Sequence, residues 1–124
     1  MYHFKIMVLT MIFFDPLFCA AQKNPLNNLP SVAFKPGSFI LSDSAKHNLN
    51  EVTATLQTHP QHGIVVTSYS SRTKHAQQLS WERVNAVVNY LASQKISRER
   101  MIYRHGQPSG EEDIVDFRSF IDEK

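Results

Sequence analysis

The chain of 124 residues contains one cysteine, four glycines and one tryptophan. A single cysteine excludes an intramolecular disulfide and the zinc modules that rely on several thiolate ligands. No apolar run reaches the roughly 20 residues that each helix of a multi-span membrane protein needs. The chain also has no large excess of either charge, because 13 Lys and Arg and 11 Asp and Glu give a net charge of +2. So small a surplus does not indicate binding to nucleic acid through phosphate contacts.

The overall composition indicates one small globular domain. Apolar residues make up 42% of the chain and aromatic residues 10%, which is enough for one hydrophobic core. Charged residues make up only 19%, and glycine and proline number four and six, so neither a disordered nor a collagen-like chain fits. A large multidomain enzyme is excluded by length alone.

The first 21 residues have the pattern of an export signal. Lys5 supplies a positive charge, and residues 6–14 form an apolar run interrupted only by one threonine. Cys19 and Ala21 are small residues at positions −3 and −1 of a cleavage site before Gln22. The sequence therefore predicts a cleaved signal peptide over residues 1–21 and export of the rest of the chain.

Cys19 offers an alternative to simple cleavage, namely the attachment of a lipid. Lipoprotein signals place a small residue before the cysteine, whereas this chain has the bulky Phe18, so cleavage before Gln22 is the favoured prediction. Residues 22–31 are rich in Asn and Pro and are predicted to form an extended leader. Residues 32–124 are predicted to form the folded domain.

Hydrophobic periodicity in this region predicts alternating strands and helices. Apolar runs predict strands over residues 32–34, 64–67, 101–104 and 114–120. The remaining signals predict two helices. The first has Ser42 as N-cap and ends at His59-Pro60, and its apolar stripe is Ala45, Leu49, Val52 and Leu56. The second has Ser80 as N-cap, and its apolar stripe is Val84, Val87, Val88 and Leu91.

The polar stretch of residues 68–78 is predicted to be a loop before the second helix. The resulting order, β-α-β-α-β-β, predicts an α+β two-layer sandwich, with two main helices packed on one face of a small mixed sheet.

The second helix carries a motif that identifies a family. Residues 79–106, LSWERVNAVVNYLASQKISRERMIYRHG, resemble the OmpA-like peptidoglycan-associated domain, whose pattern is L-S-x-x-R-A-x-x-V-x-x-Y-L followed by a short turn, a strand and a glycine. The resemblance extends from about residue 32 to about residue 120, with an upstream part that is less specific. The matching positions are Leu79, Ser80, Arg83, Val87, Tyr90, Leu91, Ile96 and Gly106.

The resemblance implies a binding domain of the periplasm and cell envelope, without enzymatic activity, cofactor or metal. The implied ligand is the diaminopimelate of peptidoglycan stem peptides, a zwitterion that needs a cation for its carboxylate and an anion for its ammonium. Arg83 stands at the position of the family's arginine, which opens the second helix and binds the carboxylate. The planar fork of an arginine suits a carboxylate, and a place in the first helical turn would add backbone N–H donors. Tyr69, Ser71 and Ser80 complete the ligand-binding residues that the resemblance implies.

The chain departs from the family at the partner of the ammonium. The family's aspartate after the second strand is replaced by Ser71, and the family's asparagine falls on Ala76. Loss of a charge-assisted hydrogen bond is expected to weaken binding roughly 10- to 100-fold. The basic residues Arg72, Lys74 and His75 also shift the expected preference from a zwitterion toward an anion.

The last strand departs as well. It is preceded by the acidic pair Glu112 and Asp113, where family members often have arginines, and the short segment before it leaves little room for the family's third helix. Elsewhere, His59 and His62 are only two of the four ligands that a structural zinc needs. Arg98, Arg100, Arg104 and His105 form a basic stretch that we expect to be a solvated rim able to attract anionic groups.

Two functions remain open at this stage. The first is an exported domain that binds peptidoglycan non-covalently, and weakly, and anchors envelope components, with outer-membrane association compatible with it. The second is a degenerate domain that keeps the fold and binds another envelope protein instead of peptidoglycan. Arg83 favours the first, and Ser71 favours the second. The sequence leaves the oligomeric state and the envelope partner undetermined.

Overall fold

The computed structural model describes residue 26 and residues 28–121. The predicted signal peptide and half of the predicted leader lie outside the described residues. In chain order the elements are β1 (Val32–Ala33), α2 (Asp43–Thr58), β2 (His62–Tyr69), α3 (Lys74–Ser93), the short 3₁₀ helix η2 (Arg98–Arg100), β3 (Met101–Gln107) and β4 (Ile114–Ile121).

The four strands form one mixed sheet in the order β1-β4-β2-β3. β2 lies in the interior of the sheet, parallel to β3 and antiparallel to β4. β1 adds only two residues, which pair with the beginning of β4. The predicted α+β architecture and element order are therefore confirmed, although three of the strands extend further than the apolar runs indicated.

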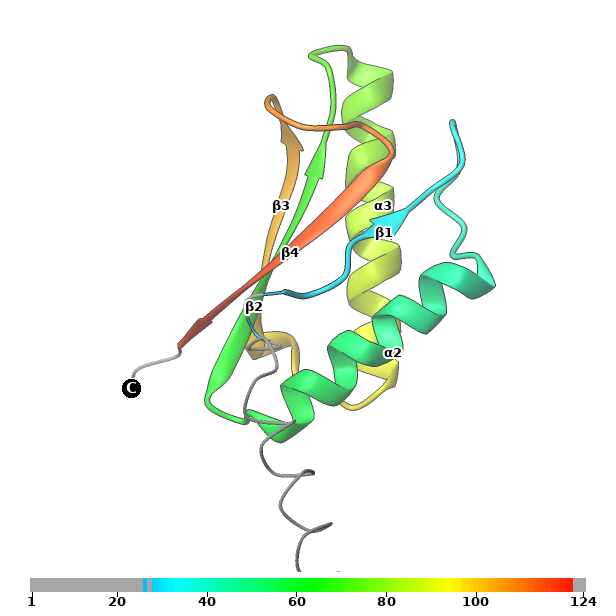
Figure 1. Ribbon diagram of the computed structural model, residues 1–124. Helices are drawn as coiled ribbons and strands as arrows, with labels where there is room; N and C mark the ends of the chain where they lie inside the picture. The colour runs from blue at the N-terminus through cyan, green and yellow to red at the C-terminus, as the bar shows by residue number, and fades with distance from the viewer. Residues whose placement is uncertain (1–25, 27, 122–124) are drawn as a thin grey trace, which may run out of the picture.

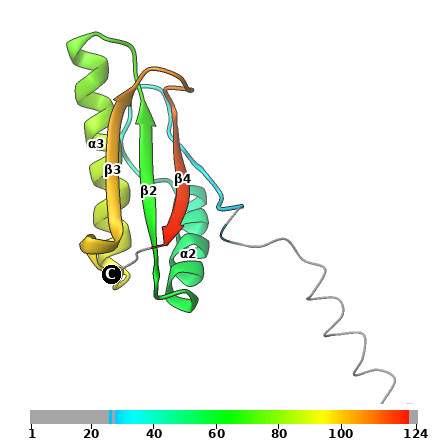
Figure 2. The same ribbon diagram turned by 90° about the vertical axis from the view of Figure 1, so that its left-hand side faces the viewer.

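Both helices cover the same face of the sheet. Figure 1 shows α2 and α3 on one side of the strands, and Figure 2 shows β3, β2 and β4 in front of both helices. The core fills the layer between sheet and helices and contains both predicted apolar stripes. Its buried members are Val32, Phe34, Ala45, Leu49, Val52, Leu56, Ile64, Val66, Val84, Val87, Val88, Leu91, Ile96, Met101 and Val115.

The boundaries of α2 agree with the sequence signals. The Ser42 side chain accepts a hydrogen bond from the backbone N–H of Ala45, as an N-cap does. The helix ends at Thr58, directly before His59-Pro60, because the residue before a proline avoids the helical region. Neither α2 nor α3, the two long helices among the described residues, has the length and apolarity needed to traverse a bilayer.

The start of α3 differs from the sequence prediction. The N-cap is Thr73, whose side chain accepts from the N–H of Ala76, and Ser80 lies inside the helix. Most residues between Thr73 and Ser80 are polar, and for this reason the sequence predicted a loop. Lysine, alanine and glutamine are nevertheless good helix formers, so this segment is helical. Arg83 consequently lies in the third turn of α3 and not in its first turn.

Candidate functional site

Arg83 is buried although it is charged. Only 1% of the residue is exposed, and it is the largest of the fully buried side chains among the described residues. Its guanidinium lies 5.1 Å from the centre of the Phe34 ring, a cation–π distance. Arg83 is remote from the first turn of α3. The prediction that backbone N–H groups of that turn assist Arg83 in binding a carboxylate is therefore wrong.

The Arg83 guanidinium binds acceptors from two distant loops. Nη2 donates to the carbonyl of Lys35 at 2.9 Å, and Nε donates to the carbonyl of Ser38 at 2.7 Å. Nη1 donates to the carbonyl of Glu112 at 2.7 Å and to Oδ1 of Asp113 at 3.0 Å. One arginine thus joins α3 to the segment after β1 and to the loop before β4, and its buried charge is compensated by the Asp113 carboxylate.

A cavity of about 180 Å³ lies beside this guanidinium. Three of the four residues expected at the site, Arg83, Tyr69 and Ser80, line it together. Glu112 and Asp113 line it as well, so its charged residues are one cation and two anions. The arrangement offers opposite charges within one small space, as a zwitterionic ligand requires.

Ser71 lies next to this cavity without lining it. Its backbone N–H donates to Oε2 of Glu112 at 3.0 Å, and its hydroxyl lies 3.3 Å from the hydroxyl of Thr73. A carboxylate therefore reaches position 71 from the loop between β3 and β4, although residue 71 itself has no charge.

Ser80 makes buried internal contacts. Its hydroxyl donates to the hydroxyl of Ser68 at 2.8 Å and accepts from the backbone N–H of Gly106 at 2.8 Å. These bonds connect α3 to β2 and β3. Gly106 has a φ of +66°, which favours glycine, and this conformation presents its N–H to the helix.

Tyr69 lines the cavity beside Arg83 and also contacts the last strand. Its hydroxyl donates to Oδ2 of Asp116 at 2.9 Å. Burial raises the pKa of Tyr69 above its ordinary value of 10.0, the hydrogen bond to Asp116 and the charge of that carboxylate raise it further, and the charge of Arg118 opposes them. Gly110 packs directly on the Tyr69 ring, so closely that a Cβ at this position would collide with it.

The basic residues around the start of α3 do not set the charge of this cavity. Arg72, Lys74 and His75 are exposed and are not among its lining residues. Lys74 instead belongs to a separate surface depression with Trp81 and His105, whose rings stack edge to face at 5.1 Å. The expected preference for a simple anion therefore has no basis in the lining of the cavity beside Arg83.

Glu112 and Asp113 are the site residues that the sequence prediction missed. The sequence did show a signal, because an acid is lost at position 71 and an acidic pair is gained before the last strand. Only the fold shows that these two changes are next to each other. No group of three or more His, Cys, Asp or Glu side chains among residues 26 and 28–121 is arranged to hold a metal ion.

Comparison with known proteins gives a family match that covers most of the chain. The model of the OmpA family matches residues 33–119. A comparison with curated proteins finds no match.

Solved structures with the same fold share little sequence with this chain. The peptidoglycan-associated lipoprotein of Burkholderia pseudomallei has 20% identity and a TM-score of 0.64, with 78% of this chain and 100% of that chain covered. The C-terminal domain of MotB from Helicobacter pylori has 13% identity and a TM-score of 0.63, covering 77% and 87%. The OmpA-like domain of FopA1 from Francisella tularensis has 18% identity and a TM-score of 0.61, covering 73% and 69%.

Proposed function

Because the chain belongs to the OmpA family, whose members bind peptidoglycan, we propose that this domain binds the peptide stems of peptidoglycan through the cavity beside Arg83. The observation that carries the proposal is the meeting of Arg83 with Glu112 and Asp113 in that cavity. A diaminopimelate end carries a carboxylate and an ammonium, and the cavity has a partner of opposite charge for each.

In this proposal the ligand carboxylate replaces the Asp113 carboxylate on Nη1 of Arg83. The exchange conserves the charge at the guanidinium, since one carboxylate leaves as another arrives. The Asp113 side chain is 46% exposed, so it can turn toward solvent or toward the ligand ammonium. The three carbonyl acceptors keep the guanidinium in place throughout.

Glu112 takes the role of the family's missing aspartate and accepts the ligand ammonium. Its carboxylate is already held beside position 71 by the N–H of Ser71. Binding is expected to be weak, because the ligand must displace Asp113 before it gains the full interaction with Arg83. Periplasmic location and non-covalent anchoring of envelope components are parts of the same proposal.

The test is sedimentation of the purified protein with insoluble peptidoglycan. Glu112→Gln should weaken co-sedimentation about 10-fold or more, because it removes the charge that meets the ammonium. Glu111→Gln is the matched control, since Glu111 is an exposed neighbour in the same loop and does not line the cavity. The double variant Ser71→Asp with Glu112→Gln returns the acid to the family's position and should restore binding. Thermal unfolding of each variant checks that the fold is retained.

Equal sedimentation of Glu112→Gln and Glu111→Gln would remove Glu112 from the site. Absence of sedimentation for the unmodified protein would contradict peptidoglycan binding and favour the second candidate, a module that binds another envelope protein. That candidate is supported by the internal hydrogen bonds of Arg83, which join three parts of the fold without any ligand.

A further inference from the structure

The face of the sheet opposite the helices carries a second group of charged residues. Figure 2 shows β3, β2 and β4 side by side on this face. Thr67 of β2 pairs with Arg104 of β3 on one side and with Asp116 of β4 on the other. Directly paired residues project from the same face of a sheet, so these three side chains form a row.

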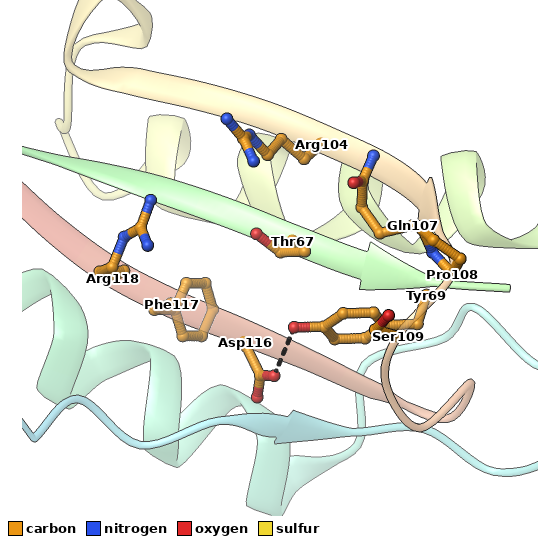
Figure 3. A pocket seen from close by; sticks show the side chains of 9 residues that line it. All are labelled: Thr67, Tyr69, Arg104, Gln107, Pro108, Ser109, Asp116, Phe117 and Arg118. Carbon is orange, nitrogen blue, oxygen red and sulfur yellow. Dashed lines mark hydrogen bonds between the residues drawn. The ribbon is translucent and has the colours of Figure 1, made fainter.

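The neighbouring row on the same face is more apolar. Val65 lies two residues before Thr67 in β2 and pairs with Ile102 and with Arg118. Ile102 is 46% exposed, so this row offers apolar surface to solvent. Arg104 and Arg118 consequently lie on either side of β2, one row apart, as Figure 3 shows.

The row of Thr67, Arg104 and Asp116, together with Arg118, borders a cavity of about 420 Å³. Arg104, Arg118 and Thr67 line it, together with Asp116 and Tyr69. Gln107 at the end of β3, and Pro108 and Ser109 in the turn after it, close one end of the cavity. The cavity shares Tyr69 with the one beside Arg83, but the two have no charged residue in common.

Arg104 and Arg118 differ from Arg98 and Arg100 in their hydrogen bonds. Arg100 donates three hydrogen bonds to backbone carbonyls, and Arg98 donates one to Asn89. Arg104 and Arg118 are exposed, and neither side chain has a hydrogen bond or ion pair with another described residue. The one acid of the cavity, Asp116, already accepts a hydrogen bond from Tyr69. The charged lining thus consists of two positive groups without a bonded partner and one negative group that has one.

We propose that this cavity is a second binding site, which takes the carboxylate of a small organic acid or of a peptide chain. Two guanidinium groups and the Thr67 hydroxyl supply the donors, and the planar fork of arginine matches a carboxylate. The summed charge of +1 from Arg104, Arg118 and Asp116 suits a monoanion, and Asp116 disfavours the higher charge of a phosphate dianion. Tyr69 and Pro108, which line the cavity, provide apolar surface for the carbon chain that bears the carboxylate. The site does not depend on peptidoglycan binding beside Arg83.

The test is a titration of the isotopically labelled protein by NMR, with butyrate as probe and butyramide as its uncharged counterpart. Butyrate should shift the signals of Thr67, Arg104 and Arg118 in a saturable manner, and butyramide should leave them in place. Arg104→Gln and Arg118→Gln should each weaken butyrate binding about 10-fold, as expected for loss of one charge-assisted hydrogen bond. Arg98→Gln, which changes a residue outside the cavity, should bind butyrate as the unmodified protein does.

N-acetyl-dialanine identifies the source of the carboxylate, and inorganic phosphate tests the selectivity of the site. Tighter binding of N-acetyl-dialanine than of butyrate assigns the site to a peptide chain end, and equal binding assigns it to a free organic acid. Equal shifts with butyrate and butyramide, or unchanged binding in both arginine variants, would overturn the site. Tighter binding of inorganic phosphate than of butyrate would overturn its assignment to a carboxylate.

Discussion

Nη1 of Arg83 lies 3.0 Å from Oδ1 of Asp113, an ion pair between the middle of α3 and the residue directly before β4. The arginine side chain is 2% exposed and the aspartate side chain 46% exposed. Arg83 therefore cannot move away without leaving its carbonyl acceptors without a donor. The Asp113 carboxylate, in contrast, can be exchanged for another carboxylate. This asymmetry underlies both the stability of the domain and the proposed exchange of carboxylates.

Replacement of Arg83 is expected to destabilise the domain. Arg83→Lys keeps the charge but cannot reach acceptors in two loops, so carbonyls such as that of Ser38 lose their donor. We expect the free energy of unfolding to fall by about 2–4 kcal/mol, measured by urea denaturation. Arg72→Lys, at an exposed position, should change it by less than about 0.5 kcal/mol. Similar unfolding of both variants would contradict the role of Arg83 in joining these loops.

The hydroxyl of Ser80 is expected to stabilise the contact between α3 and the sheet. Ser80→Ala leaves the buried Ser68 hydroxyl and the half-buried Gly106 N–H without their hydrogen-bond partner. The expected loss is about 1–3 kcal/mol in the free energy of unfolding, the cost of an unsatisfied buried polar group. Ser44→Ala serves as control, because Ser44 is exposed on α2. If both variants unfold at the same denaturant concentration, these hydrogen bonds contribute nothing.

The hydrogen bond from Tyr69 to Asp116 is expected to contribute stability that depends on pH. The pKa of Tyr69 is raised in the folded protein, so its contribution is fully present below the ordinary value of 10.0 and is lost as the pH rises through the raised value. Tyr69→Phe should therefore lower the free energy of unfolding by about 0.5–1.5 kcal/mol at neutral pH.

The difference in the free energy of unfolding between the unmodified protein and Tyr69→Phe should shrink at strongly alkaline pH. Urea denaturation at about pH 8 and about pH 11 measures it. Tyr103→Phe is the control, because it removes a hydroxyl that has no hydrogen bond to another described residue, and it should lower the free energy of unfolding less than Tyr69→Phe does at about pH 8. A difference that stays constant across this interval would exclude the proposed linkage.

Arg100 is expected to stabilise the end of α2. Its guanidinium donates to the carbonyls of Leu56 and His59 at 2.8 Å and to that of His62 at 2.9 Å. A positive charge that binds the last carbonyls of a helix also interacts favourably with the helix dipole. Arg100→Gln should lower the melting temperature by several degrees, which corresponds to about 1.5–3 kcal/mol. Arg98→Gln should lower it far less, and the reverse ranking would contradict this role.

The sequence predicted the helices best where burial follows a regular period. The apolar stripes of α2 and α3 could be read directly, because a 3.6-residue repeat specifies which face is buried. The beginning of α3 could not, since its first turns are polar and contact little of the core. Helix propensity, rather than hydrophobicity, decides the structure there.

The candidate site was predicted only in part, for a different physical reason. Local sequence motifs indicated Arg83, Tyr69 and Ser80, and these three do line one cavity. The acceptors of Arg83 lie far from it along the chain, and no periodicity connects Ser38 or Asp113 to α3. Their contact is a property of the sheet order, which brings the loop before β4 next to α3.

The sheet order also has a consequence for the order of folding. Apart from the short η2, β2, α3 and β3 follow one another along the chain, so the parallel pairing of β2 with β3 closes a short loop. β1 and β4 lie near opposite ends of the domain, so their two-residue pairing closes a loop that contains nearly all of it. Closing a long loop costs more conformational entropy, and few contacts compensate for it here. We therefore expect substitutions in the buried contacts of β2, α3 and β3 to slow folding, and substitutions in β1 mainly to speed unfolding.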